Sequence, residues 1–339
     1  MPTREIIEKI LGELPKKRIG ILGDLFLDRY LEIEKSLNEI SIETGLIAYQ
    51  VTAVRSIPGA VGTVINNLAA LGVEAIEPFA IIGFDGEGYE LRQALEGVVV
   101  SAGILSWPGR RTPTYTKPML HETGRPAYEL NRLDIKNRQP TPAAAVDEVC
   151  SRFASRFDSF DAVIVLDQVS EADCGVVTTQ VRERIAQLGQ MQPRRFILAD
   201  SRENIHLFRN VHIKPNAAEC MQGARPGIDW VEAARDLARL NQRLVFCTRG
   251  HEGIAIVDAD EFRQIPAYPV TGPVDIVGAG DSCSAGIACA VACGCDYATA
   301  AAFGNLIASI TIQQLGTTGC ARPDQVRERW SQVSKGQPS

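Results

Sequence analysis

The residues best placed to do chemistry form a short glycine-rich segment near the C-terminal end of the chain. It contains Gly278, Ala279, Gly280 and Asp281, and a run of small and apolar residues typical of a buried helix follows it. Glycines let backbone amides approach a ligand closely, and the first turn of a helix leaves its N–H groups unpaired. The segment therefore predicts an anion site suited to a phosphate.

Asp281 stands where this loop becomes a helix. An acid beside an anion site suggests a base that accepts a proton from a hydroxyl attacking the phosphate. We expect the helix dipole to keep Asp281 ionised, as a base at neutral pH requires. A plain structural explanation is also available, because Gly-x-Gly turns are common and aspartate often starts helices.

The stretch from Asp275 to Asp281 resembles the C-terminal signature of the ribokinase-like (PfkB) carbohydrate kinases, with Ile276 where the family usually has threonine. The resemblance covers nearly the whole chain. It implies an ATP-dependent sugar kinase in which Asp281 is the catalytic base and the amides of residues 278–280 form the anion hole. Within the family, the order of motifs looks most like the kinase domain that acts on heptose 7-phosphate.

Two acids follow the first predicted strand, which runs from Arg18 to Leu22. This strand ends at Gly23-Asp24, which puts Asp24 at the edge where open α/β sheets bind ligands, and Asp28 follows. Carboxylates accept several hydrogen bonds and suit sugar hydroxyls. Asp24 could instead cap a turn and Asp28 could be solvated, but the resemblance favours substrate binding by both.

A second glycine turn resembles the family's N-terminal signature, Gly-Gly-x-x-x-Asn. The resemblance places Gly59 and Thr63 at the substrate. Here Ala60 replaces the second glycine, and Thr63 replaces the sugar-binding asparagine with a shorter side chain. Asn66 or Asn67 could compensate. Asn67 could also face solvent or cap a neighbouring segment.

Two segments, about 31–57 and 111–135, do not alternate with helices and contain short strand-like runs. In the family such segments form a small β-sheet lid that covers the sugar and often pairs two subunits. The resemblance therefore implies a homodimer through the lid. Lys117 in the second segment is a candidate ligand for a phosphate on the substrate, although a solvated charge is the commoner explanation for a lysine.

Regular alternation begins near residue 142, with a helix over 142–157, a strand over 162–166, a helix over 171–188 and a strand over 195–199. This order predicts a mainly parallel sheet covered on both faces. The resemblance specifies a ribokinase-like three-layer α/β/α fold. No linker rich in proline, glycine or serine divides the chain, so we expect one domain over residues 1–339, with the lid as an appendage.

Asn216 and Glu219 resemble the family's Asn-x-x-Glu motif. Glu219 could hold hydrated Mg²⁺, because Mg²⁺ keeps its waters and takes few protein ligands. The same spacing also makes a helix capping box. Asp200 and Arg202 resemble the family's Asp-x-Arg/Lys turn near the phosphates.

Thr248, Gly250 and Gly253 resemble the family's nucleotide-binding segment, although their structural explanation is a hairpin turn. Asn305 stands where relatives often have an asparagine near the adenine. In relatives, the first aspartate of the signature, here Asp275, and a loop like 316–320 help to hold a monovalent cation. The resemblance thus adds Mg²⁺ and K⁺ to ATP as expected cofactors.

The composition is that of an ordinary globular chain of 339 residues with a net charge of −6. It offers no basic surplus for nucleic acid and no apolar run long enough to span a membrane. Nine cysteines, an odd number scattered through apolar segments, indicate reduced thiols in a cytoplasmic protein. We expect the tail, residues 335–339, to be loose.

Two alternatives remain open from the sequence. The acceptor could be another sugar, a sugar phosphate or a nucleoside. The chain could also be a nucleotide- or sugar-binding sensor that has lost catalysis. The departures from the family signatures at Ala60, Thr63 and Ile276 are compatible with this alternative.

Overall fold

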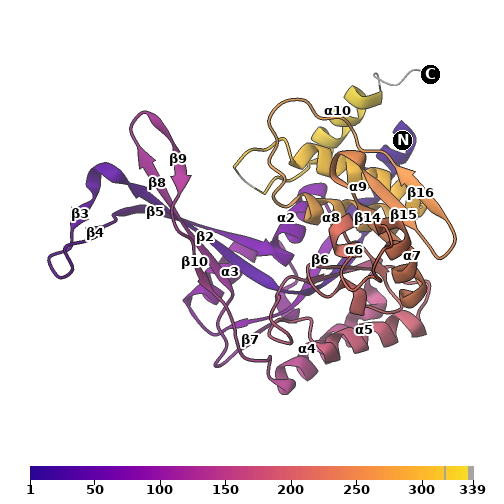
Figure 1. The fold of residues 1–339 in the computed structure, drawn as a ribbon, viewed down its shortest axis with the longest axis horizontal. Helices are drawn as coiled ribbons and strands as arrows, with labels where there is room; N and C mark the ends of the chain where they lie inside the picture. The colour runs from indigo at the N-terminus through magenta and orange to yellow at the C-terminus, as the bar shows by residue number, and fades with distance from the viewer. Residues whose placement is uncertain (317, 335–339) are drawn as a thin grey trace.

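The computed structural model describes residues 1–316 and 318–334, and the tail expected to be loose lies outside them. A nine-stranded sheet runs through the body of the molecule (Figure 1). Neighbours are parallel from β14 to β7, whereas β15 and β16 are added antiparallel at one edge. In spatial order the strands are β16 (Phe262–Ile265), β15 (Ile254–Val257), β14 (Val245–Thr248), β13 (His212–Ile213), β12 (Ile197–Ser201), β11 (Ala162–Asp167), β1 (Arg18–Gly23), β6 (Ala75–Gly83) and β7 (Ile104–Trp107).

Both faces of this sheet are buried, which explains the continuous apolar runs of its central strands. Ile19 and Ile21 of β1 join one core, whereas Val163 and Val165 of β11 join the other. The first core is covered by α1 (Arg4–Glu13), α2 (Val61–Leu71), α3 (Gly86–Leu95), α8 (Ala279–Ala292), α9 (Tyr297–Thr311) and α10 (Pro323–Ser334). The second is covered by α4 (Ala143–Arg156), α5 (Thr179–Met191), α6 (Ala217–Cys220) and α7 (Trp230–Asn241). The three-layer α/β/α architecture is confirmed.

A smaller sheet extends to one side of the body (Figure 1). Its central strand β2 pairs parallel with β8 and antiparallel with β5. Its strands are β2 (Leu25–Glu34), β5 (Val51–Ala60), β8 (Thr114–Glu122), β9 (Arg125–Glu129) and β10 (Leu133–Ile135), and β3 (Glu39–Ile40) and β4 (Ile47–Ala48) form a separate hairpin. The expected lid segments both lie here, but β2 begins at Leu25, earlier than expected, because it follows β1 with only Asp24 between them.

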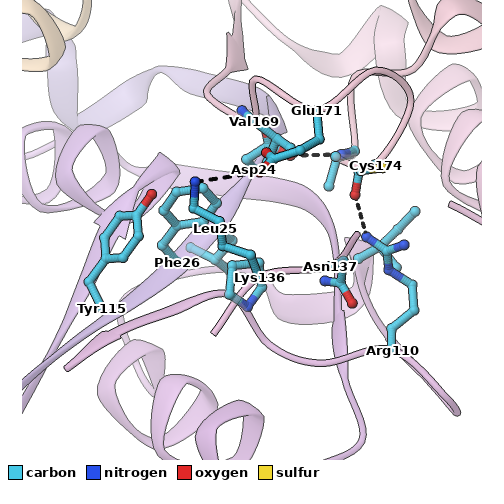
Figure 2. Close-up of a pocket in the computed structure, with 14 residues that line it drawn as sticks. Asp24, Leu25, Phe26, Arg110, Tyr115, Lys136, Asn137, Val169, Glu171 and Cys174 are labelled. Atoms are coloured by element: carbon cyan, nitrogen blue, oxygen red, sulfur yellow. Dashed lines mark hydrogen bonds and ion pairs between the residues drawn. The ribbon is translucent and has the colours of Figure 1, made fainter. Parts of the chain in front are cut away.

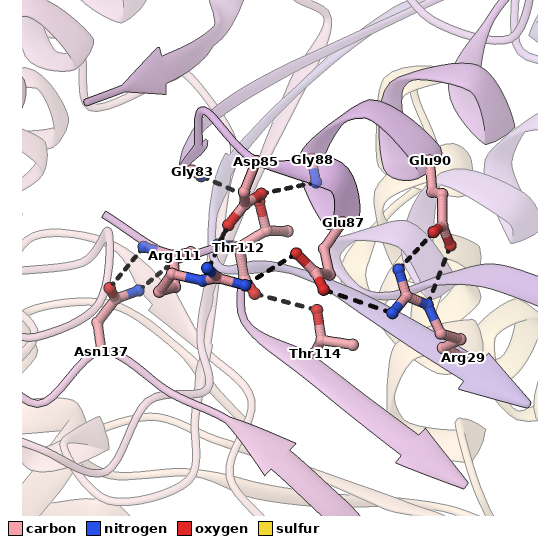
Figure 3. Close-up of polar contacts among 10 residues, drawn as sticks. All are labelled: Arg29, Gly83, Asp85, Glu87, Gly88, Glu90, Arg111, Thr112, Thr114 and Asn137. Carbon is pink, nitrogen blue, oxygen red and sulfur yellow. Dashed lines mark hydrogen bonds and ion pairs between the residues drawn. The ribbon is translucent and has the colours of Figure 1, made fainter. Parts of the chain in front are cut away.

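An ion-pair network fastens this small sheet to the body (Figure 3). Arg29 of β2 lies between Glu87 and Glu90 of α3, with its Nε 3.1 Å from Glu90 Oε2. On the β8 side, Arg111 pairs with Glu87 at 3.0 Å and with Asp85, which caps α3. Arg29, Glu87 and Asp85 are mostly buried, whereas Arg111 is more exposed, and together their contacts join the small sheet to α3.

The helix expected over 171–188 begins later, at Thr179. The hydroxyl of Thr178 caps it by accepting a hydrogen bond from the amide of Val181 at 3.3 Å. The preceding segment is held as a loop, in which Asp173 has a positive φ of 54° and the amide of Val176 donates to Asp24. These local contacts compete with helix formation, and the expected boundary was therefore wrong.

Helix α8 is buried along most of its length and packs closely against α9. A Cβ on Gly286 would lie 2.9 Å from the Cα of Gly304 and 3.0 Å from Cγ1 of Ile307. Only glycine permits this approach, which fixes the position of the α8 N-terminus. Within the described residues, none of the helices is long and apolar enough to cross a membrane.

Candidate active site

The predicted anion loop leads into α8. Gly278 is the N-cap residue and has a φ of 77°, a left-handed conformation that favours glycine. The N–H of Ala279 donates to the carbonyl of Ile276 at 3.1 Å. One of the three amides expected to hold phosphate therefore already has a partner. The anion-hole role of Gly278, Ala279 and Gly280 stays a prediction.

Asp281 lies partly buried in the first turn of α8. Burial and the charge of Asp200 together raise the pKa of its carboxyl to about 7, against the lowering effect of Lys214 and Arg202. We expected the helix dipole to keep this group ionised, but with a pKa of about 7 it is only partly ionised at neutral pH, because loss of water and a nearby acid disfavour the charge. A carboxyl with this pKa is suited to exchange protons near neutral pH.

Two buried groups of opposite charge lie beside Asp281. Lys214 follows β13 and its side chain is 3% exposed. Its Nζ is 2.7 Å from Oδ2 of Asp200, at the end of β12. The same Nζ lies 3.6 Å from the point where a Cβ on Gly280 would stand, so the ammonium faces the predicted anion loop.

Three of the predicted substrate residues meet on one face of the small sheet. Lys117 Nζ is 3.2 Å from Oδ1 of Asp28, and it also donates to the hydroxyl of Tyr30 at 3.2 Å. A Cβ on Gly59 would lie 2.7 Å from Oδ2 of Asp28, so this carboxylate rests against the glycine backbone. Asp28, Gly59 and Lys117 therefore form one cluster, which β2, β5 and β8 position.

Thr63, in the first turn of α2, lies against the anion loop. Its Cγ2 is 3.2 Å from the point where a Cβ on Gly278 would stand. Gly59 lies in β5, which leads through Ala60 directly into α2, and not in the expected turn. One short segment therefore connects the cluster on the small sheet to the start of α8.

The other two predicted substrate residues hold backbone segments. Asp24 is 2% exposed, and its carboxylate accepts hydrogen bonds from the amides of Gln168, Val169 and Val176 at 2.7 to 3.1 Å. Asn67 is fully buried and donates to the carbonyls of Thr63 and Gly319. Sequence reasoning did name capping as the alternative for both. Their substrate roles stay predictions, and the geometry favours Asp28 over Asp24.

A pocket opens beside Asp24, between the small sheet and the loop that follows β11 (Figure 2). Phe26 and Tyr115 line it from the small sheet, with their rings edge to face at 5.4 Å. Arg110 also lines it, is 8% exposed, and donates to the carbonyl of Cys174 at 2.6 Å. Because Phe26 and Asp28 point to the same face of β2, the pocket lies on the same side of the sheet as the Asp28 cluster.

The predicted phosphate and metal residues gather at the ends of β13 and β14. Asn216 and Glu219 form a complete capping box, in which Glu219 Oε2 accepts from the amide of Asn216 at 2.7 Å. Asn216 also pairs with Thr248, whose amide donates to the carbonyl of Pro215. Burial raises the pKa of Glu219. The explanation of this motif as a helix capping box is thus correct. The other carboxylate oxygen of Glu219, Oε1, takes no part in the capping box.

Two further predicted nucleotide residues pack around the end of β16. Asn305 donates to the carbonyls of Ile265 and Pro266 at 3.2 and 3.1 Å. A Cβ on Gly253 would lie 2.2 Å from the carbonyl oxygen of Ile265, so only glycine fits there. Gly250 lies in the turn between β14 and β15 with a φ of 54°. The hairpin is confirmed, and nucleotide contact by these residues stays a prediction.

Asp275 ties two loops together. Its Oδ1 accepts from the amide of Val277 at 3.1 Å and its Oδ2 from the amide of Gly316 at 3.1 Å. Thr317, in the loop expected to help hold a cation, lies outside the described residues. Among the described residues, no group of three or more histidine, cysteine, aspartate or glutamate side chains is arranged to hold a metal ion. The monovalent cation stays a prediction.

Comparison with known families decides the broader assignment. The model of the pfkB family carbohydrate kinases matches residues 30–324, which is most of the chain and includes most of the small sheet and the α8 loop. The chain belongs to the PfkB family of carbohydrate kinases. This membership supports a phosphotransferase that acts on a sugar.

Similar PfkB sequences include two named bifunctional protein HldE. The one from Geotalea uraniireducens is 28% identical over 323 residues, and the one from Rhodospirillum rubrum is 28% identical over 331 residues. The matches cover 93% and 95% of this chain but only 63% and 64% of those proteins. The chain therefore spans less than two thirds of the length of these relatives.

Solved structures support the ribokinase-like fold. Arabidopsis thaliana ribokinase, complexed with ribose and ATP, has a TM-score of 0.65 at 17% identity, with 92% of this chain and 98% of that chain covered. Escherichia coli phosphofructokinase-2, in complex with potassium, has a TM-score of 0.65 at 18% identity, with 94% and 99% covered. At these identities the likeness shows the fold alone.

Sequence reasoning missed Lys214 and Tyr30. Lys214 stands between the end of a strand and the Pro215-Asn216 turn, and nothing in its sequence context shows that it is buried beside an acid. Tyr30 follows Asp28 with the two-residue spacing that puts side chains on one face of a strand, and this spacing is a signal that could have found it.

Proposed function

We propose that this PfkB protein transfers the γ-phosphoryl group of ATP to a hydroxyl of a sugar or sugar phosphate, with Asp281 as the base. The observation that carries the proposal is the position of Asp281. It lies in the first turn of α8, beside the buried Lys214–Asp200 pair, with a carboxyl pKa raised to about 7. A group used only for binding would need neither this position nor this pKa.

The transfer proceeds by one displacement at phosphorus. The acceptor O–H gives its proton to the Asp281 carboxylate as its oxygen forms a bond to the γ-phosphorus. The bond from the γ-phosphorus to the bridging oxygen breaks, and ADP leaves with that electron pair. Asp281 then releases the proton to solvent. Phosphoryl transfer depends mainly on positioning and charge neutralisation, so a modest base is sufficient.

The proposal includes ATP and Mg²⁺, and it assigns the metal ion to Glu219. Mg²⁺ neutralises phosphate charge when it is bound, and it keeps most of its waters. Glu219 fits such an ion, because Oε1 is left over from the capping box and can accept from a metal-bound water. Bound Mg²⁺ would also lower the pKa that burial raises at this carboxyl.

Cations on the small sheet are candidate ligands for a phosphate on the acceptor, and each of them also pairs with a carboxylate of the sheet: Lys117 with Asp28, Arg55 with Glu32 and Arg132 with Asp134. Lys117 and Arg55 both lie over the ring of Tyr30, at 4.8 and 4.1 Å, and Arg132 lies over Tyr115 at 4.3 Å. These cations share the face that carries Asp28. We therefore place heptose 7-phosphate first among the acceptors, in agreement with the motif order.

The test is an acceptor panel with ATP, Mg²⁺ and K⁺, read by ADP release and by phosphorus NMR of the product. The panel contains free sugars, sugar phosphates including heptose 7-phosphate, and nucleosides. We expect stoichiometric ADP and a new phosphate ester with one sugar-based acceptor. Thermal stabilisation by ATP without turnover on any acceptor would contradict the proposal and favour the sensor.

A further inference from the structure

Lys214 is a buried cation that neither the predicted motifs nor the architecture of the fold explains. Its amide continues the parallel ladder by donating to the carbonyl of Ala199 at 2.8 Å. Its side chain then runs to Asp200, which also lies near Ser284 of α8, with Ser284 Oγ 3.4 Å from Asp200 Oδ2. The ammonium thus lies between the ends of two central strands and the first turns of α8.

Structural need alone explains this pair poorly. Burying two charges costs several kcal/mol per ion before their attraction is counted, and apolar replacements are often as stable. The carboxyl of Asp200 keeps Lys214 protonated, because its charge raises the lysine pKa despite the opposing effect of burial. The ammonium has three N–H donors, and Asp200 is the one carboxylate within ion-pair distance among the described residues.

The direction of the side chain suggests what the remaining donors are for. Lys214 Nζ lies 3.6 Å from the point where a Cβ on Gly280 would stand. Gly280 has no side chain, so nothing from that residue covers the ammonium. Asp281, the proposed base, follows directly, and its carboxyl lies close enough for Lys214 to lower its pKa.

We propose that Lys214 binds the transferring phosphoryl group, with Asp200 as the positioning residue that holds its ammonium beside Gly280. The inference rests on the proposed function and adds a contact to it. In the displacement, negative charge on the γ-phosphoryl oxygens meets a fixed cation in a site shielded from water, where such a charge is most effective. Lys214 takes no proton and stays charged throughout.

The experiment compares Lys214→Met with the wild type in three measurements: ATP affinity and ADP affinity by calorimetry with Mg²⁺, and turnover with the acceptor found above. Because the contact is to the γ-phosphoryl group, ATP affinity should fall by roughly tenfold. ADP affinity should stay nearly unchanged. Turnover should fall by about 100-fold or more, the loss typical of removing one donor to a developing charge.

Two controls keep the result interpretable. Lys16→Met removes an exposed lysine paired with Glu13 and should leave all three measurements unchanged. If Lys214→Met unfolds because Asp200 is left unpaired, the double variant Lys214→Met with Asp200→Asn removes both charges and carries the same expectations.

The outcomes separate this inference from the proposed function. A folded Lys214→Met enzyme with an unchanged ratio of ATP to ADP affinity and near wild-type turnover would overturn the role of Lys214 and leave the kinase intact. An equal loss of ATP and ADP affinity would also overturn it, because it would indicate a general nucleotide contact. Absence of ATP binding and turnover in the wild type would overturn the proposed function, and this inference with it.

Discussion

At the scale of single residues, the chemistry depends on how Asp281 is charged. Burial and the neighbouring Asp200 raise the pKa of its carboxyl to about 7, whereas Lys214 and Arg202 act in the opposite direction. A base works only when it is deprotonated, so the fraction of competent enzyme falls as the pH falls through this pKa. In water, the same side chain has a pKa well below 7 and is already ionised in mildly acidic solution.

We therefore predict that kcat/KM falls on the acid side with an apparent pKa near 7. Asp200→Asn removes a negative charge that disfavours ionisation of Asp281, so it should move this acid limb to lower pH. Rate profiles of both enzymes between acid and neutral pH check this, with unfolding monitored at each pH. A profile that is flat through pH 7, or a limb that moves upward in Asp200→Asn, would contradict the assignment.

Asn67 gives a second prediction at this scale. Its amide holds the carbonyls of Thr63 and Gly319 in a buried position, so Asn67→Ala should lower the free energy of unfolding by about 1–3 kcal/mol. The adjacent, less buried Asn66 is the matched control, and Asn66→Ala should change stability by no more than about 0.5 kcal/mol. Urea unfolding measures both. Unchanged stability of Asn67→Ala together with a raised KM for the acceptor would instead favour a sugar ligand.

At the scale of elements, the contact between α8 and α9 sets where the anion loop and Asp281 stand. Gly286→Ala would place a Cβ 2.9 Å from the Cα of Gly304, so the helices must separate. We expect a loss of about 1–3 kcal/mol in the free energy of unfolding and a lower kcat, because α8 carries the base.

The control for this variant is another helical glycine. A Cβ on Gly12 in α1 meets nothing within 4 Å, so Gly12→Ala should be neutral or stabilise by up to about 1 kcal/mol. Thermal unfolding and kcat measured on both variants make the comparison. Equal behaviour of the two would mean that the α8–α9 contact does not fix the site.

At the scale of the whole molecule, the sequence predicted the order of elements well because most signals are local. The alternation of apolar runs from residue 142 onward is enough to predict a parallel sheet with helices on both faces. Glycine-containing segments mark the starts of α2 and α8. The start of α5 was misplaced because the loop before it is held by Asp24, which lies far away in the sequence.

The candidate site was harder to predict from the sequence, because its contacts also join residues that lie far apart in the chain. The contact of Asp28 with Lys117 depends on the register of β2 and β8, and the burial of Lys214 depends on α8 covering the ends of β12 and β13. The raised pKa of Asp281 was not predicted, because it follows from burial in the folded chain and from Asp200, which comes from a different strand. Motifs identify residue types, but their charge states follow from neighbours brought together by the fold.

The molecule also presents an apolar surface at the β3–β4 hairpin, which the chain inserts between β2 and β5 of the small sheet. Ile40, Ile42 and Leu46 are exposed around the β3–β4 hairpin. Because the resemblance implies pairing through this region, we predict a dimer in sedimentation velocity, which Ile42→Asp with Leu46→Asp dissociates. A wild type that sediments as a monomer at the concentrations used for assay would contradict this prediction.

The most direct test of the central claim is the turnover of Asp281→Asn with the acceptor that the wild type uses. Asparagine keeps the size of the side chain and cannot accept the proton as a carboxylate does. We expect the variant to fold, to bind ATP and to lose most of its turnover at every pH. A folded Asp281→Asn enzyme with near wild-type turnover would show that the proton goes elsewhere and would contradict the mechanism.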